Sequence, residues 1–227
     1  MASVKSTFLG RGMYRFSEVA RYACLNQRRV RSWFVQRTDQ RLVPVFSSDF
    51  ERMDGEYLVS FLDMIDAWIA GKLRTAGVSM RTVRAAHSSL KHDLGTIHPF
   101  AHSSIYTDGK RIFADAAQYV NDPTLTEVVS RQTFLPKVRE SLELIDYSLE
   151  SSLAERWNIA VGVTIDPAVC FGQPVVKGTG VSTYVLHQAY LANRRDSELV
   201  AELFGIAQKE VGDAVDFEDR YGHQLAA

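Results

Sequence analysis

Cysteine is scarce in this chain, with only Cys24 and Cys170 among 227 residues. Two cysteines so far apart exclude a disulfide framework and a cysteine-based zinc site, and we expect Cys24 to be a small buried hydrophobe. No apolar run approaches the roughly 20 residues that a helix needs to cross a bilayer. No charged-then-apolar leader opens the chain. These absences predict a cytoplasmic protein that has no membrane partner.

Signatures of catalysis are missing as well. The six histidines form no His-Glu-x-x-His pair, and His98 and His102 merely flank a Pro-Phe turn. The glycines of the last third are not followed by the Lys-Ser or Lys-Thr of a phosphate-binding loop, and no Gly-x-Ser-x-Gly elbow is found. We therefore expect a protein that is not an enzyme, with no catalytic residues, no cofactor and no bound metal.

Charge is present in both signs but is unevenly distributed. The formal net charge is −1, yet the first forty-odd residues are basic and the last thirty-odd are acidic. Such asymmetry indicates different partners for the two ends. The alternative for the acidic end is a simple solvated surface.

The segment from Tyr14 to Trp33 predicts two short helices joined by a tight turn. Ser17 is a candidate N-cap for the first helix and Asn26 for the second. Apolar residues recur at helical spacing, so each helix should have one buried face. These buried residues are Val19, Ala20 and Ala23 in the first helix, with Phe16 just ahead of it, and Val30 with Trp33 or Phe34 in the second.

The outward face of the second helix is rich in arginine, which is typical of a helix that lies in a groove of DNA. Arginine forks suit guanine edges and phosphates, and glutamine suits adenine. A helical hairpin with a solvated basic face is the alternative. The predicted DNA-binding residues are Arg15, Gln27, Arg28, Arg29, Arg31 and Ser32, with Lys110 and Arg111 of a later hairpin.

Short strands and longer helices follow. Leu42–Phe46 and Tyr57–Ser60 predict a wing-like hairpin. Apolar spacing predicts a helix that starts near Phe61 and ends at Gly77, and a second helix from Ser79 to the Gly95 stop. Asp108-Gly109 predicts a hairpin over Ile105–Phe113, while Pro136–Glu150 fits either a strand or a helix.

This order of parts resembles the MerR-type winged helix-turn-helix regulators. The resemblance covers about the first hundred residues and includes the helix-pair turn Leu73–Arg84, which reads LRTAGVSMRTVR. It implies that the first helix pair binds DNA. The chain departs from the pattern at His98-Pro99-Phe100, where MerR proteins continue into a long dimerisation helix.

The last third has closely spaced turn residues between short apolar pairs, which predicts small strands in a twisted hairpin. Three short helices should follow, over Thr183–Leu191, from Asp196 or Ser197 to Gly205, and from about Gln208 to Phe217. The pattern closely resembles the domain of unknown function 433, with Gly180 where arginine is usual. The matching residues are Pro167, Gly172, Pro174, Val175, Gly178, Thr179 and Val181.

The third of these helices is acidic, and acidic residues facing phosphates would weaken DNA binding. We therefore expect a protein contact in this region, by self-association or with another protein, although most of its apolar residues could equally form its core. The predicted partner-binding residues are Val176, Lys177, Thr179, Tyr184, Phe204 and Phe217.

A winged helix-turn-helix followed by this domain resembles the VapB-type antitoxins, which pair with PIN-family ribonuclease toxins. The resemblance implies an antitoxin of a type II toxin–antitoxin module, a homodimer that binds double-stranded operator DNA, neutralises a PIN-like toxin and represses its own operon. One alternative is a MerR-like regulator that senses a ligand in an apolar pocket near Trp68, Phe100 and Trp157. Another is an interaction module with no DNA role.

The predicted fold class is mainly α with small β elements (α+β). It combines an N-terminal winged helix-turn-helix with a C-terminal homeodomain-like three-helix bundle that is preceded by a short β hairpin. The predicted domains are 1–120, a connecting segment 121–158, and 159–227.

Overall fold

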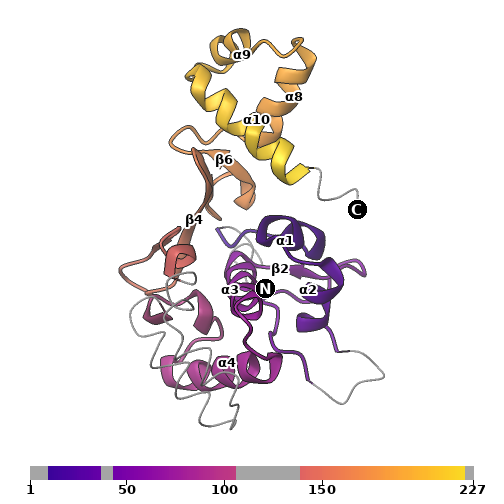
Figure 1. Ribbon diagram of the computed structural model, residues 1–227, viewed down its shortest axis with the longest axis vertical. Helices are drawn as coiled ribbons and strands as arrows, with labels where there is room; N and C mark the ends of the chain where they lie inside the picture. The colour runs from indigo at the N-terminus through magenta and orange to yellow at the C-terminus, as the bar shows by residue number, and fades with distance from the viewer. Residues whose placement is uncertain (1–9, 37–42, 106–138, 223–227) are drawn as a thin grey trace, which may run out of the picture. The chain divides into compact units, whose positions relative to one another are not determined.

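The computed structural model describes residues 10–36, 43–105 and 139–222. Helices and small antiparallel sheets make up a mixed α+β fold, which confirms the predicted class (Figure 1). The chain forms two compact units: an amino-terminal unit, Tyr14–Ala154, and a carboxyl-terminal unit, which comprises Glu155 onward and also takes in residues 10–13. The predicted division at residues 120 and 158 stays a prediction.

Each unit has its own set of elements. The amino-terminal unit contains β1 (Tyr14–Arg15), α1 (Phe16–Ala23), α2 (Gln27–Phe34), β2 (Leu58–Val59), α3 (Phe61–Thr75), α4 (Met80–Leu94), the 3-10 turn η2 (Pro99–Ala101) and β3 (Ile145–Tyr147). β4 (Ala154–Ala160) leads into the carboxyl-terminal unit, which contains β5 (Val163–Ile165), η3 (Cys170–Gly172), β6 (Pro174–Val176), α8 (Thr183–Ala192), α9 (Ser197–Phe204) and α10 (Gln208–Gly222).

The first helix pair forms where the sequence predicts it. Phe16, Val19, Ala20 and Ala23 are buried, as expected. The predicted cap Ser17 is wrong, because α1 begins at Phe16 and its N-cap is Arg15, two residues before Ser17. The Glu18 carboxylate accepts a 2.8 Å hydrogen bond from the Arg15 backbone N–H, which satisfies a free donor at the helix start.

The turn between α1 and α2 corrects another prediction. Cys24 is exposed rather than buried, because it ends α1 in a left-handed conformation with φ 53° that turns the chain toward α2. Asn26 is the N-cap of α2 as predicted, and its Oδ1 accepts from the backbone N–H groups of Arg28 and Arg29. Val30, Trp33 and Phe34 form the buried face of α2.

The predicted wing is wrong in its pairing. Residues 43–46 form no strand; instead the backbone N–H groups of Val45 and Phe46 both donate to the Trp33 carbonyl. β2 pairs with β1, Tyr14 opposite Val59. The tight turn lies at Met53–Glu56, a β-bridge closed by two backbone hydrogen bonds. Its central residues have φ of 46° and 82°, the positive values that favour a two-residue hairpin turn.

The helices α3 and α4 confirm the predicted periodicity and the predicted caps Ser79 and Gly95 of α4. Ser60 and Ser79 accept backbone hydrogen bonds as their N-caps, and Gly95 ends α4 in a left-handed conformation. Phe46 belongs to an aromatic cluster of the amino-terminal unit, with its ring centroid 5.2 Å from Phe34 and 6.4 Å from Phe100. Phe46 is therefore held by apolar packing rather than by strand pairing.

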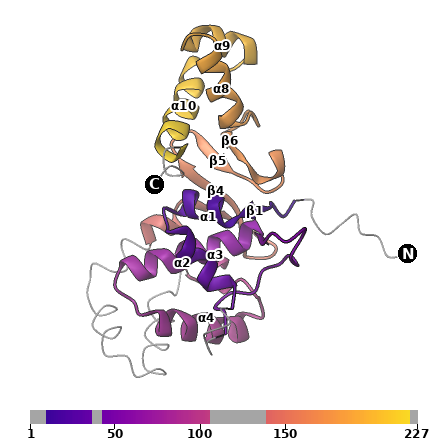
Figure 2. The same ribbon diagram turned by 90° about the vertical axis from the view of Figure 1, so that its right-hand side faces the viewer.

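The carboxyl-terminal unit combines antiparallel strands with three helices. β4, β5 and β6 pair in that order, and the predicted hairpin is the antiparallel β5–β6 pair, with Thr164 opposite Val175. α8 and α10 run side by side (Figure 2). The core includes Val176, Leu186, Val200, Val211 and Ala214. The three predicted helices are all present, and α10 extends five residues beyond the predicted Phe217.

Not all of the acidic side chains of the last helix, α10, are exposed to solvent. Glu218 is buried, and the Thr183 hydroxyl at the start of α8 donates a 2.5 Å hydrogen bond to its carboxylate. This buried contact ties α10 to α8, so Glu218 has a packing role. Asp216 and Asp219 remain exposed.

Two predictions concern segments outside the described ranges. Apart from Ile105, the hairpin Ile105–Phe113 lies there, and so do the first three residues of Pro136–Glu150. The described end of the latter segment forms a short helical turn and then β3. Within the described ranges, no helix combines the length and the apolar character needed to cross a membrane.

Candidate nucleic-acid interface

The outward face of α2 is built by two features of its sequence. The Asn26 cap fixes the start of the helix, and the buried residues Val30, Trp33 and Phe34 orient it against the core. The remaining side chains are therefore directed away from the protein. Gln27, Arg28, Arg29, Arg31 and Ser32 are all exposed. The Ser32 hydroxyl donates to the Arg29 carbonyl at 2.7 Å, so it is partly engaged within the helix.

Tyr57 organises a second part of this basic face. The Arg31 guanidinium lies over its ring at 5.2 Å, and the Arg52 guanidinium lies over it at 5.0 Å. Phe16 stacks on Tyr57 at 5.9 Å. Sequence reasoning missed Arg52, because it joins the arginines of α2 only through the unexpected Met53–Glu56 turn, where its Nε donates to the Gly55 carbonyl.

Arg15 is exposed, but its guanidinium is already paired. Its Nε donates to Glu56 at 2.8 Å, and both side chains are more than half exposed. A pair this exposed contributes little stability, and a phosphate could compete for the arginine. Lys110 and Arg111, the other two predicted contacts, lie outside the described residues.

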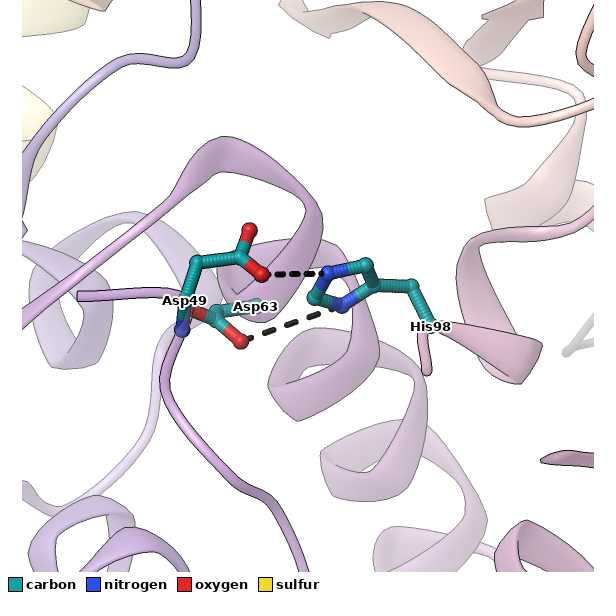
Figure 3. A group of neighbouring side chains, drawn as sticks. All are labelled: Asp49, Asp63 and His98. Atoms are coloured by element: carbon teal, nitrogen blue, oxygen red, sulfur yellow. Dashed lines mark hydrogen bonds and ion pairs between the residues drawn. The ribbon is translucent and has the colours of Figure 1, made fainter. Parts of the chain in front are cut away.

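A buried cluster of charged residues lies in the same unit (Figure 3). His98, just before η2, has Nε2 3.1 Å from Asp49 Oδ1 and Nδ1 3.2 Å from Asp66 Oδ2. Asp63 Oδ1 lies 3.8 Å from the same Nδ1. The side chains of His98 and the three aspartates are at most 5% exposed. The cluster joins three chain segments: the loop before β2, α3 and η2.

Backbone donors complete this network. Asp63 Oδ2 accepts from the N–H groups of Ser60 and Asp49 at 2.9 and 3.0 Å, and Asp66 Oδ1 accepts from Ala101 at 2.9 Å. His87 on α4 also faces Asp66, with Nε2 3.8 Å from Oδ2. This nitrogen has no hydrogen-bond partner among the described residues.

The cluster shifts the pKa values of two of its members. Burial by itself lowers the pKa of His98, but its hydrogen bonds to Asp49 and Asp66 and the negative charges around it outweigh burial and raise the pKa to about 10. Burial raises the pKa of Asp63 to about 6, against the opposing effect of the two backbone N–H donors and of His98. His98 is therefore an imidazolium at neutral pH when no other cation is present.

Sequence reasoning missed this cluster. The one available signal was a pair of acidic residues, Asp63 and Asp66, three positions apart within an otherwise apolar helix. Asp49 gave no signal, since it lies in a polar loop and reaches His98 only in the folded chain. His98 was noticed only for its place before a Pro-Phe turn.

The predicted partner-binding residues are divided between core and surface. Val176 and Phe217 are buried at 1% and 2% exposure, so they belong to the core of the carboxyl-terminal unit and not to its surface. Thr179 and Phe204 are half-buried, and Lys177 and Tyr184 are exposed. Further exposed apolar side chains on α8 and α9 are Val185, Leu191, Leu199 and Leu203.

The three aromatic residues of the predicted ligand pocket fill cores instead. Trp68 and Phe100 are buried in the amino-terminal unit, and Trp157 is buried in the carboxyl-terminal unit. A pocket of about 400 Å³ lies elsewhere, beside β5 and β6. Its lining includes Asp166, which forms a 3.1 Å ion pair with Arg156, and Gly180, whose φ of 70° favours glycine.

Comparison with known proteins agrees with this architecture. The match to a solved structure defines the fold: the chain superposes on the crystal structure of Rv2018 from Mycobacterium tuberculosis with a TM-score of 0.72 and 22% identity, covering 89% of this chain and 97% of that one. Residues 163–217 match the family described as "Protein of unknown function (DUF433)".

A curated protein extends the similarity in sequence. Over 168 residues the chain is 24% identical to "Putative antitoxin VapB45" from Mycobacterium tuberculosis, an alignment that spans 69% of this chain and 70% of the other. The chain is therefore similar in sequence to VapB45 over most of its length, and residues 163–217 match the DUF433 model.

Proposed function

We propose that this protein is the antitoxin of a type II toxin–antitoxin module, which binds operator DNA through α2 and a PIN-family ribonuclease toxin through its carboxyl-terminal unit. The observation that carries the DNA half is the exposed arginine face of α2, extended by Arg52 over Tyr57. The similarity to VapB45 supports the antitoxin half. Binding as a homodimer suits a helix too short to distinguish a site alone.

The amino-terminal unit provides phosphate and base contacts in this proposal. Arg28 and Arg31 lie one turn apart on the exposed face of α2, so both can enter one groove. Their forks can bind guanine edges or phosphates. Arg52 and Arg15 lie outside the helix and are placed to contact the backbone at its side. Dimer binding would then repress the operon that encodes both proteins.

The test measures affinity for duplex DNA from upstream of the gene at several salt concentrations. The double variant Arg28→Ala/Arg31→Ala should weaken binding and lower the slope of log K against log salt by about 0.9 for each phosphate that is no longer neutralised. Arg81→Ala/Lys91→Ala on α4 is the matched control, since it removes two exposed positive charges from the same unit. Equal slopes for both variants would refute the assignment.

The toxin half is tested separately. We expect the product of the neighbouring gene to copurify with the full chain and to lose its ribonuclease activity when bound. Tyr184→Ala/Leu203→Ala changes two side chains that are 60% and 63% exposed, so it should weaken toxin binding without unfolding the unit. A neighbouring gene product that neither binds nor is inhibited would argue against an antitoxin.

A ligand-sensing regulator is the second candidate, and the pocket beside β5 and β6 is the observation in its favour. Trp157 pairs with Ile165 on the neighbouring strand, next to the pocket residue Asp166. A metabolite that enters this pocket should change tryptophan fluorescence and DNA affinity together. The same metabolite should have no effect on toxin binding if ligand sensing and toxin neutralisation use separate sites.

A further inference from the structure

The structure assigns a divalent metal site to the buried cluster of Asp49, Asp63 and His98, with Zn²⁺ as the ion whose coordination it fits best. One ring nitrogen and two carboxylate oxygens from these residues lie within 4.8 Å of one another, and all three side chains are at most 5% exposed. This inference does not depend on the proposed antitoxin function.

The ring of His98 is oriented as a metal ligand should be. Zinc-bound histidines usually donate their second ring N–H to a carboxylate, which fixes the orientation of the ring. Here Nδ1 lies 3.2 Å from Asp66 Oδ2, and Nε2 is directed at Asp49. Asp66 is therefore the orienting carboxylate, and Nε2 is the nitrogen available to the ion. Figure 3 shows Asp49 at Nε2 and Asp63 at Nδ1 of this ring, so the Asp63 carboxylate must turn toward Nε2 to share one ion with it.

The distances fit a single small ion only after the site contracts. In a tetrahedral site, ligand atoms about 2.0 to 2.2 Å from zinc lie roughly 3.3 to 3.6 Å from one another. The three atoms lie within 4.8 Å of one another, so the widest separation would need to close by about 1 Å. Asp49 lies in a loop, which can make this adjustment without moving a helix.

The charge of the ligands also suits a cation. Three aspartate side chains converge on the His98 imidazole in a buried site. Buried charges are stable when they are paired or coordinate a metal. A divalent ion that replaces the Nε2 proton increases the positive charge of the cluster by one, and that proton passes to solvent.

His87 provides an independent observation. Its side chain is 7% exposed, and its Nε2 lies 3.8 Å from Asp66 Oδ2 without a hydrogen-bond partner among the described residues. A buried polar nitrogen of this kind is costly unless something binds it. Asp66 also orients His98, so a water molecule at the edge of the cluster, beside Asp66, is the kind of group that would satisfy it.

The chemistry of the donors selects among ions. Imidazole with carboxylates suits zinc and similar transition metals. Calcium requires six to eight oxygen ligands, and magnesium retains several waters, so neither suits a closed site with one nitrogen and two carboxylates. The ion would connect the loop that contains Asp49 to α3 and to the segment before η2.

The experiment uses the full chain, stripped with a chelator and then titrated with Zn²⁺ by calorimetry in buffers of different ionisation enthalpy. We expect one ion per chain, net release of protons on binding, and a higher melting temperature. Co²⁺ should give a visible absorption band typical of tetrahedral nitrogen and oxygen ligands. No binding by the stripped wild-type chain would overturn the proposal.

Variants locate the ion. Asp49→Asn keeps the size of the side chain and should abolish both the Co²⁺ band and the thermal shift. His92→Gln is the matched control, because His92 also pairs with an aspartate, Asp93 at 3.2 Å, but both side chains are exposed. This variant should leave metal binding unchanged. Metal binding that survives in Asp49→Asn, or that disappears in His92→Gln, would place the ion elsewhere.

Ring ¹⁵N chemical shifts of His98 in the wild-type chain supply a readout that does not depend on any variant folding. Saturating Zn²⁺ should move the Nε2 resonance from the value of a protonated nitrogen to that of a metal-bound one, while Nδ1 stays protonated. A ring that remains doubly protonated at saturation would refute the site, because the cluster would then be a structural ion pair only.

Discussion

At the scale of single residues, a few side chains connect the core to the surface that is proposed to bind DNA. Asn26 caps α2 with two backbone hydrogen bonds, and Tyr57 places Arg31 and Arg52 over one ring. Neither Asn26 nor Tyr57 belongs to the apolar core. Asn26 nevertheless determines where the arginines of α2 lie, because it fixes the start of the helix. Tyr57 determines where the guanidinium groups of Arg31 and Arg52 lie, because both pack over its ring.

The cap of α2 gives the first prediction. Asn26→Ala should lower the free energy of unfolding by about 1 kcal/mol, since the N–H groups of Arg28 and Arg29 lose their acceptor. Asn26→Ser should retain most of the stability because serine is also a good cap. Urea unfolding of both variants checks this, and equal destabilisation by alanine and serine would show that the cap is not the cause.

The buried imidazole of His98 gives a pH prediction for the chelator-treated chain. Its pKa of about 10 in the folded state exceeds the ordinary value of 6.5, so folding favours its protonated form. This stabilisation is fully present below about pH 6.5 and is lost as the pH rises toward 10. Asp63, with its pKa raised to about 6, is already ionised through most of this window.

Unfolding measured between about pH 7 and pH 9 should therefore show stability falling with rising pH. Asp49, Asp63 and Asp66 face His98, and His87 lies beside Asp66, so the effect belongs to this group of side chains. His98→Gln should have a flatter profile over the same range. A wild-type profile as flat as that of the variant would contradict the assignment.

At the scale of elements, turns of unusual conformation set the positions of strands and helices. The Met53–Glu56 turn brings Arg52 to Tyr57. In the carboxyl-terminal unit, Gly162 joins β4 to β5 with φ 68° and packs against α10. A Cβ atom there would lie 2.1 Å from Asp213 Oδ2, so glycine is needed both for conformation and for space.

Gly162→Ala tests the close approach of Gly162 to Asp213, and Gly178→Ala is its matched control. Gly178 has φ 83° but nothing within 4 Å of an added Cβ, so alanine there adds only backbone strain of about 1 to 2 kcal/mol. Gly162→Ala should cost about 1 to 3 kcal/mol more, because Asp213 must move away from Lys209, which it contacts at 2.6 Å. Denaturant unfolding should separate the two variants; equal destabilisation would show that strain alone matters.

At the scale of the whole molecule, the two compact units have separate cores. Leu73 and Phe100 are fully buried in the amino-terminal unit, and Leu186 and Val211 are fully buried in the other. In the proposed function each unit binds a different partner. Damage to one core should therefore affect one partner more than the other.

Val211→Ala tests this separation. It should destabilise the carboxyl-terminal unit by about 2 kcal/mol, because it leaves a cavity in a closed core. Hydrogen exchange should rise across α8 and α10 but stay unchanged in α1 and α2, and affinity for duplex DNA should be kept. An equal rise in exchange throughout the chain would show that the units unfold together.

The sequence by itself determined the elements of this protein. Apolar spacing and capping residues such as Asn26, Ser60, Ser79 and Gly95 act within a few residues of the chain, so α2, α3, α4 and the last three helices could be predicted. The exposed arginine face of α2 follows from the same periodicity, because Val30 and Trp33 leave only one direction for the charged side chains.

Only the tertiary structure decided which distant residues meet. The pairing of β1 with β2, the position of Arg31 over Tyr57, the burial of Glu218 and the convergence of Asp49, Asp63 and His98 all depend on contacts between residues far apart in sequence. No local pattern specifies such contacts, because they result from packing several elements around a shared core. The candidate metal site was therefore hidden in the sequence, whereas the candidate DNA-binding helix was visible in it.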